Sequence, residues 1–167
     1  CVEIAKKYGV ELLVCSSLNR NSGTMVREKT KMEKMLISGV AADKNVAKIR
    51  VAGLGNDPES TFRLLNLLDR NNLNIDVMIQ SLGKDGTKSV SFTVAKPDML
   101  RTIDVLNDNK DSLGIKKLDY DENVAKVSVI GAGVRSHSGV AAKMFGALAN
   151  AGINAEMVTT SEIRITA

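Results

Sequence analysis

The sequence predicts an α+β fold that contains two similar small domains, and two observations support this prediction. The segment 43–81 recurs as the segment 121–161, and both copies begin with Asp-x-Asn-Val-Ala-Lys and continue to two closely spaced glycines. Within each copy, hydrophobic residues first recur at every second position, as in a strand, and then at every third or fourth position, as in a helix. This pattern is typical of a sheet covered by helices. A repeat period of about 80 residues is too long for a solenoid, so we interpret it as a duplicated domain.

The elements of the first copy follow from local patterns. Residues 46–53 alternate, with Ile49 and Val51 predicted to face inward, as in a half-buried strand. Asp57 and Pro58 are residue types that favour an N-cap and the first helical position, and an apolar helical stripe follows them. The remaining predicted elements are strand 73–82, strand 88–95, a helix that opens at Pro97, and strand 115–120. The order βαββαβ predicts two helices on one face of a four-stranded antiparallel sheet, the ferredoxin-like arrangement.

The second copy is predicted to begin in the same way and to be incomplete. Its expected elements are strand 124–130, helix 138–151, strand 153–160 and strand 162–166. Residues 35–42, MLISGVAA, form an additional predicted strand that could fill the empty place in the second sheet. Residues 1–17 are expected to form a separate helix that ends at Gly9, followed by a buried-type strand. We therefore expect three regions: residues 1–34, a first domain of residues 46–120, and a second domain of residues 35–43 together with 121–167.

Composition limits the classes of function. The chain has 167 residues, of which 44% are hydrophobic and 25% charged, a globular composition. Aromatic residues make up only 3%, so a site built on stacked rings is not expected. No apolar run is long enough to cross a bilayer, and the first residues do not resemble a signal peptide, so we expect a cytoplasmic protein with no membrane partner. The net charge of +4 lies mostly in residues 1–34, which we interpret as a solvated face rather than a nucleic-acid site.

No catalytic constellation is visible in the sequence. It contains no Walker-type phosphate loop, no dinucleotide fingerprint and no Cys/His cluster with metal-ligand spacing. Cys1 and Cys15 are interpreted as reduced thiols, and His137, the single histidine, as a turn residue. We therefore expect no catalytic residue, metal or cofactor within these residues.

The two glycine turns nevertheless offer a binding chemistry. Each leads into a predicted helix N-terminus, where free backbone N–H groups suit a carboxylate. Polar residues of the strands that follow could accept hydrogen bonds from an ammonium group; they are Asn74, Asp76 and Gln80 in the first copy and Asn154, Glu156 and Thr160 in the second. Together these groups would suit a free amino acid. The alternative, equally open at this point, is that they are ordinary caps and outward-facing strand residues.

Three segments of the chain carry a family resemblance. Residues 130–165, which include SHSGVA and TSEIRI, resemble the second ACT repeat of bacterial aspartokinase regulatory regions. Residues 37–54 resemble the strand that leads into the first ACT repeat, and residues 3–26 resemble the last helix and strand of the amino-acid kinase domain. In this family the first repeat is inserted within the second, which supports the pairing of residues 35–42 with the second copy.

The resemblance implies a function. Aspartokinases phosphorylate aspartate with ATP, and their ACT pair binds end-product amino acids and inhibits the kinase. We therefore expect lysine, threonine or both as effectors, a homodimer formed through the ACT domains, and contact with the kinase domain of the same protein. The ATP and Mg sites would lie upstream, so the chain is expected to be part of a longer protein and to be inactive alone.

The resemblance also implies two effector sites, each of which two chains could share. In the first turn, Glu59 stands where the family usually has glycine, and its carboxylate would repel that of a ligand; Ser138 replaces the usual proline of the second turn. The first site would consist of Asn56, Asp57, Pro58, Glu59, Ser60, Thr61, Asn74, Ile75, Asp76 and Gln80. The second would consist of Val134, Arg135, Ser136, His137, Ser138, Gly139, Val140, Ala141, Asn154, Ala155, Thr160 and Ser161.

Two other classes of domain have the same order of secondary-structure elements. One is an ACT-type amino-acid sensor or dimerisation module of a different enzyme, against which the kinase-like residues 3–26 argue. The other is an RNA-binding domain, which stacks bases on aromatic residues of its central strands. Those strands contain a single Phe92 and residues 35–121 carry no basic stripe, so RNA binding is not expected.

Overall fold

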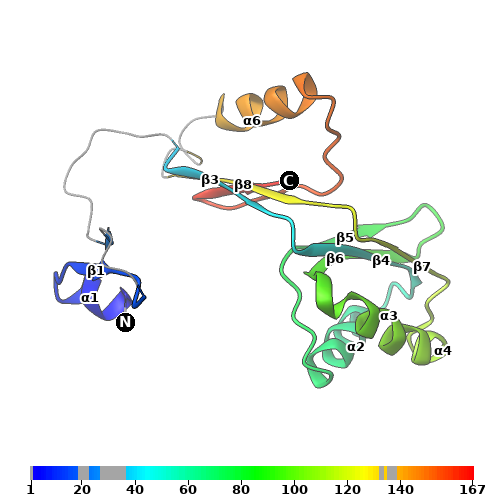
Figure 1. The fold of residues 1–167 in the computed structure, drawn as a ribbon. Coiled ribbons are helices and arrows are strands. Elements are labelled where there is room, and N and C mark those ends of the chain that lie inside the picture. The colour runs from blue at the N-terminus through cyan, green and yellow to red at the C-terminus, as the bar shows by residue number, and fades with distance from the viewer. Residues whose placement is uncertain (1, 19–22, 27–36, 132–133, 135–138) are drawn as a thin grey trace. The chain divides into compact units, whose positions relative to one another are not determined.

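The computed structural model describes residues 2–18, 23–26, 37–131, 134 and 139–167 (Figure 1). The chain divides into two compact units, Cys1–Met35 and Leu36–Ala167. The first unit contains α1 (Val2–Lys7), β1 (Leu12–Val14) and β2 (Thr24–Val26), and the two strands pair antiparallel. None of the helices in the described part of the chain is long and apolar enough to span a membrane.

Two expectations for the first unit have different outcomes. The helix ends just before Gly9, which has a φ of +63°, so the predicted helix end is confirmed. The buried-type strand is wrong, because Leu13 is 59% exposed and Val14 is similarly exposed. The described residues of this unit supply only the short α1 as a possible cover for the two strands.

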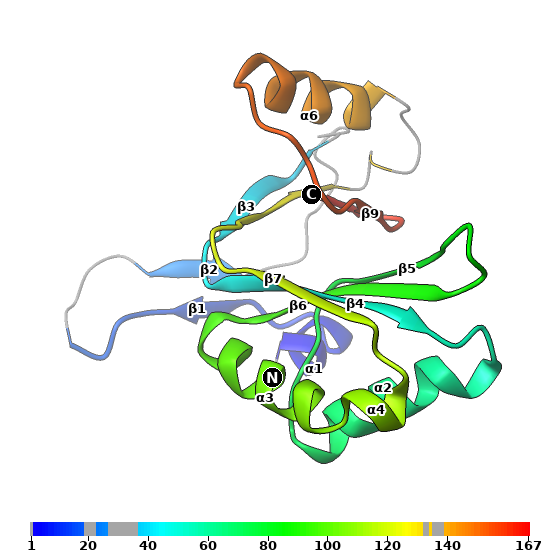
Figure 2. The same ribbon diagram turned by 90° about the vertical axis from the view of Figure 1, so that its right-hand side faces the viewer.

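The first repeat has the predicted ferredoxin-like sheet. Its strand order is β5-β6-β4-β7, with all neighbours antiparallel. The helices lie together on one face of this sheet (Figures 1 and 2). The elements are β4 (Val46–Leu54), α2 (Pro58–Arg70), β5 (Met78–Leu82), β6 (Lys88–Ala95), the 3₁₀ turn η1 (Lys96–Asp98), α3 (Met99–Asp108), α4 (Lys110–Leu113) and β7 (Lys117–Asp121).

The core of the first repeat lies between these helices and the sheet. Ile49 and Val51 of β4 are fully buried, as the alternating pattern predicted, and they pack with Phe92 of β6. Leu64 of α2 and Leu106 of α3 are also fully buried in this cluster. Aliphatic side chains therefore supply almost the whole core, as the low aromatic content requires.

The second repeat has its own four-stranded sheet, and a segment from before the first repeat completes it. The strand order is β3-β8-β10-β9. The pairing of β3 with β8 runs from Gly39 opposite Ile130 to Asp43 opposite Lys126, so the predicted completion of the sheet is confirmed. The elements are β3 (Gly39–Asp43), β8 (Lys126–Ile130), α6 (Gly139–Asn150), β9 (Thr159–Thr160) and β10 (Arg164–Thr166).

Several strands are shorter than predicted, and two of them begin five or more residues later than expected. The strand expected at 73–82 begins only at Met78. Thr93 explains the interruption, because its carbonyl accepts a hydrogen bond from the Asp76 N–H and its hydroxyl accepts one from the Val77 N–H. The strand expected at 153–160 is reduced to Thr159–Thr160, and the residues before it line a cavity that is described below.

Candidate functional site

The turn that leads into α2 is built by Gly53 and Ser60. Gly53 has a φ of +90°, and a Cβ there would come within 2.5 Å of the Lys116 Cβ, so this position requires glycine. Ser60 is 1% exposed, and its hydroxyl lies 2.5 Å from the Gly55 carbonyl oxygen and 3.1 Å from that of Asp57. Ser60 therefore closes the turn, and its hydroxyl is occupied by backbone.

The structure joins this turn to the neighbouring strand β5. The hydroxyl of Thr61 donates a hydrogen bond to Gln80 Oε1 over 2.8 Å, and Gln80 is exposed. Asp57 is the N-cap residue, as predicted, but its side chain makes no capping hydrogen bond and instead lies 3.7 Å from Arg63. The predicted site residues Asn56, Asp57, Pro58 and Glu59 are all exposed around the start of the helix.

The remaining residues of the first predicted site lie in the segment before β5. Asn74 is exposed and Ile75 packs against the first core. Asp76 forms an ion pair with Lys126 of the second repeat. The structure thus brings Thr61 and Gln80 together, whereas the carboxylate of Asp76 is engaged by the other repeat.

The second predicted site is only partly within the described residues. Arg135, Ser136, His137 and Ser138 lie outside them. Of the others, Val140 is buried in the second core, while Val134 and Ala141 pack against it, so these three side chains are structural. Gly139, the first residue of α6, is exposed.

The strand part of the second site forms an exposed hairpin. Thr160 of β9 pairs with Ile165 of β10. The Ser161 N–H donates a hydrogen bond to the Arg164 carbonyl over 2.7 Å, and the Ser161 hydroxyl is 3.4 Å from the same oxygen. Ser161 is exposed, which leaves its hydroxyl accessible to a ligand.

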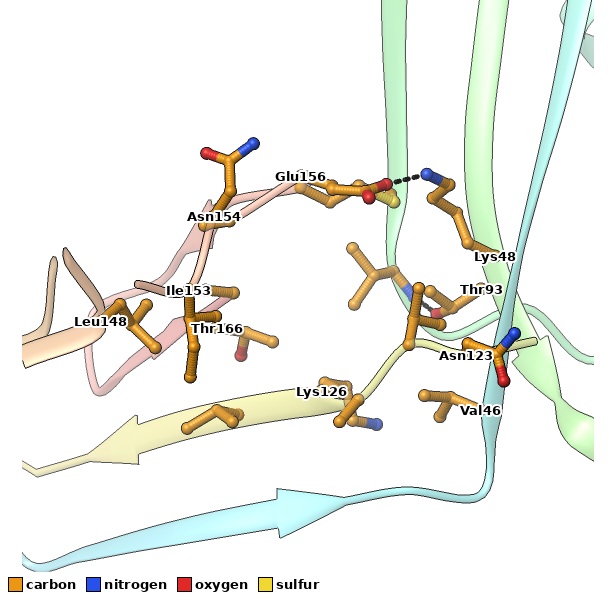
Figure 3. Close-up of a pocket in the computed structure, with 17 residues that line it drawn as sticks. Val46, Lys48, Thr93, Asn123, Lys126, Leu148, Ile153, Asn154, Glu156 and Thr166 are labelled. Atoms are coloured by element: carbon orange, nitrogen blue, oxygen red, sulfur yellow. Dashed lines mark hydrogen bonds and ion pairs between the residues drawn. The ribbon is translucent and has the colours of Figure 1, made fainter. Parts of the chain in front are cut away.

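A cavity of about 290 Å³ lies between the two repeats (Figure 3). Among the predicted site residues, Asn154 and Ala155 contribute to its lining, and Glu156 forms an ion pair with Lys48 at its rim. The lining residues are Val46, Lys48, Val77, Thr93, Asn123, Val124, Ala125, Lys126, Val127, Leu148, Ile153, Asn154, Ala155, Glu156, Met157, Thr166 and Ala167.

The prediction of binding residues from the sequence missed most of this cavity. The internal repeat did contain a sign of the cavity, because Lys48 and Lys126 hold equivalent positions in the two copies and both line the cavity. Within the described part of the chain, no group of three or more His, Cys, Asp or Glu residues is placed to hold a metal ion. The polar groups brought together here can instead bind a small charged organic molecule through hydrogen bonds and ion pairs.

Comparison with known proteins gives consistent results. Residues 127–167 match the family model described as the ACT domain. The chain is 37% identical to an aspartokinase of Pseudomonas aeruginosa, over 98% of the chain and 40% of that protein. The chain thus spans about 40% of the length of the curated relatives that it matches.

Two solved structures are also similar to the chain. The structure of aspartokinase alpha and beta subunits is 42% identical, with a TM-score of 0.72, and the match covers 78% of this chain and 85% of that one. The ligand-free regulatory subunit of aspartate kinase from Thermus thermophilus is 31% identical, again with a TM-score of 0.72, over 78% of this chain and 86% of that one.

Proposed function

The chain belongs to the aspartokinase family, as part of its C-terminal regulatory region of ACT domains, and on this premise we propose that it binds an end-product amino acid and thereby inhibits a kinase domain of the same protein. That kinase domain would transfer phosphate from ATP to aspartate with Mg, outside the residues described above. The proposed effectors are lysine, threonine or both, and the proposed location is the cytoplasm.

The domain division expected from the sequence belongs to the same proposal. Residues 1–34 would be the end of the kinase domain and its linker, and residues 46–120 the first ACT domain. Residues 35–43 with 121–167 would form the second ACT domain. The pairing of β3 with β8 supports this assignment, because it joins the segment before the first repeat to the segment after it.

The observation that carries the proposal is the hydrogen bond between Thr61 and Gln80. It places an amide side chain of β5 beside the first turn of α2. The backbone N–H groups of that turn favour a carboxylate, and Gln80 Oε1 can accept a hydrogen bond from an ammonium group. An α-amino acid presents both groups, separated by one carbon.

The location of this site suits an assembly of two chains. In the described sheet, β5 is an edge strand, as is β9 in the second repeat, so both sites lie where a second copy could approach. Inhibition then requires that the effector binds one arrangement of the two chains better than another. A coupling of about 1–3 kcal/mol would change kinase activity about 5- to 150-fold.

Calorimetric titration with lysine and threonine, with methionine as a control, tests the proposal. We expect saturable binding of at least one of the first two by the 167-residue chain, or by the full-length enzyme if the chain alone is silent. Replacing the exposed Ser161 with Trp should abolish inhibition at the second site while the folded state persists. Full inhibition of the Ser161→Trp enzyme would contradict the site assignment. Absence of binding by the full-length enzyme would contradict the effector function.

A further inference from the structure

Two ion pairs connect the repeats in a reciprocal way. Lys48 of the first repeat pairs with Glu156 of the second. Lys126 of the second repeat pairs with Asp76 of the first. The two lysines are equivalent in the repeat, and each acid lies two residues after an equivalent asparagine. The repeats therefore face each other with approximate two-fold symmetry, and the cavity of about 290 Å³ lies between them.

The two ion pairs differ in how firmly they are held. Lys126 lies close to two carboxylates, because Asp43 is 3.7 Å away in addition to Asp76. For Lys48, Glu156 is the one acidic partner among the described residues, whereas the side chains of the two pairs are exposed to nearly the same extent. The Lys48–Glu156 pair at the rim of the cavity is therefore the one that a ligand can separate more easily (Figure 3).

The second repeat presents an uncovered apolar wall to the cavity. Ile153 is 56% exposed, whereas the equivalent Leu73 of the first repeat is 4% exposed. Leu148 is half-buried, whereas the equivalent Leu68 is buried. Both Leu148 and Ile153 line the cavity, so an apolar group placed there would remove their surfaces from water.

We propose that this cavity binds a free α-amino acid with an aliphatic side chain, inserted between Lys48 and Glu156. The ligand carboxylate accepts a hydrogen bond from Lys48 Nζ, and its ammonium group donates one to the Glu156 carboxylate. Every charge of the separated pair regains a partner, which avoids the cost of an unpaired charge beside an apolar wall. The aliphatic side chain covers Leu148 and Ile153.

The size of the cavity agrees with such a ligand. Ligand pockets usually measure about 300–1,000 Å³, so a volume of about 290 Å³ suits a small molecule rather than a nucleotide or a helix. The cavity shares Asn154 and Ala155 with the second predicted effector site, but it involves neither Gln80 nor Ser161. The existence of this cavity site does not depend on whether lysine or threonine binds at the effector sites.

Titration of the 167-residue chain with L-leucine and L-valine, followed by calorimetry and by methyl NMR, tests the inference. We expect saturable binding and shift changes at the Leu148 and Ile153 methyl groups. Leucinamide lacks the carboxylate and 4-methylpentanoate lacks the ammonium group, so each should bind about tenfold or more weakly than leucine.

Matched variants separate this site from the other. Glu156→Gln should weaken leucine binding about tenfold or more, whereas the equivalent change Asp76→Asn should leave it within about twofold. Gln80→Leu should leave leucine binding unchanged. Dispersed amide spectra serve as the check that each variant is folded.

Three results would overturn the inference. The first is no saturable binding of leucine or valine. The second is binding that is lost in Gln80→Leu and retained in Glu156→Gln, which places the ligand at the effector site and leaves the proposed function intact. The third is a shift of the Ile153 methyl signal that follows protein concentration instead of ligand, because a second copy of the chain then covers the wall.

Discussion

The hydroxyl of Thr61 lies 2.8 Å from Oε1 of Gln80 and donates a hydrogen bond to it. This bond joins the first turn of α2 to the edge strand β5, although the two residues are separated by the rest of the helix and a loop. Because the bond is exposed, it contributes little to folding, about 0.5–1 kcal/mol. Its importance lies in where it holds the amide group of Gln80.

We expect Thr61→Val to weaken effector binding with little loss of stability. Valine keeps the shape of threonine and removes the hydroxyl that orients Gln80, so the affinity for the effector should fall about threefold to tenfold. The free energy of unfolding should change by less than about 1 kcal/mol. Calorimetric titration and urea denaturation measure the two quantities. Ser112→Ala, which removes an exposed hydroxyl bond in α4, is the control and should leave the affinity unchanged.

Glu59→Gly should strengthen effector binding at the first site. Glu59 lies in the first turn of α2, and its negative charge opposes that of a ligand carboxylate near the same helix start. Removing the charge should raise the affinity about twofold to fivefold at low salt. Glu59→Gln separates the effect of charge from that of size and should give most of the gain. Equal affinities for all three proteins at low salt would show that Glu59 points away from the ligand.

Two equivalent apolar positions of the repeats, Leu73 and Ile153, should differ in how much their truncation lowers the stability of the protein. Leu73 is 4% exposed, and Leu73→Ala should lower the free energy of unfolding by about 2–4 kcal/mol because it leaves a cavity. Ile153 is 56% exposed, and Ile153→Ala should lower it by less than about 1 kcal/mol. Urea denaturation of both variants gives the comparison. Similar losses would mean that Ile153 is covered in solution.

Ser60→Ala should destabilise the first repeat. The buried Ser60 hydroxyl lies within hydrogen-bonding distance of two backbone carbonyl oxygens at the start of α2, and alanine leaves both without that donor. We expect a loss of about 1–2 kcal/mol in the free energy of unfolding. Thermal denaturation against the control Ser112→Ala tests this. A Ser60→Ala protein as stable as the control would contradict the structural role of Ser60.

The hairpin between β5 and β6 should show a local pH dependence. The Thr87 hydroxyl and backbone N–H donate hydrogen bonds to Asp85, and they hold the pKa of that carboxyl below its ordinary value of 3.8. The resulting stabilisation is present above pH 3.8 and is lost as the pH falls through the pKa of the folded state. In Thr87→Val, the pKa of Asp85 should rise toward 3.8, as measured by NMR titration of its carboxyl carbon. An unchanged pKa would exclude the hydroxyl as the main cause.

The internal repeat explains why most of the fold could be predicted. Alternation in residues 46–53 places Ile49 and Val51 inward, and the missing fourth strand of the second copy required a strand from elsewhere, which β3 supplies. The shortening of β5 could not be predicted, because it depends on hydrogen bonds that the distant Thr93 accepts from the N–H groups of Asp76 and Val77.

The candidate site was less predictable. A carboxylate such as Asp76 suits a ligand ammonium group and a lysine side chain equally well, and local sequence does not distinguish the two. Its pairing with Lys126, and the cavity near it, depend on how the two repeats are placed against each other. The effector role of Asp76 therefore stays a prediction.

The pairing of β3 with β8 has a consequence for the order in which the chain folds. These strands are separated by the whole first repeat, and joining them directly would require the closure of a long loop, at an entropic cost that grows with its length. Within the first repeat, Lys48 of β4 lies opposite Asp121 of β7. Folding of the first repeat therefore brings β3 and β8, the strands before and after it in the sequence, close together. During synthesis the first repeat can fold as soon as it leaves the ribosome, whereas the second must wait for β8. A gene segment that encodes residues 121–167 alone would lack β3, so a stable second repeat would need β3 joined directly in front of β8, which the pairing of Asp43 with Lys126 allows.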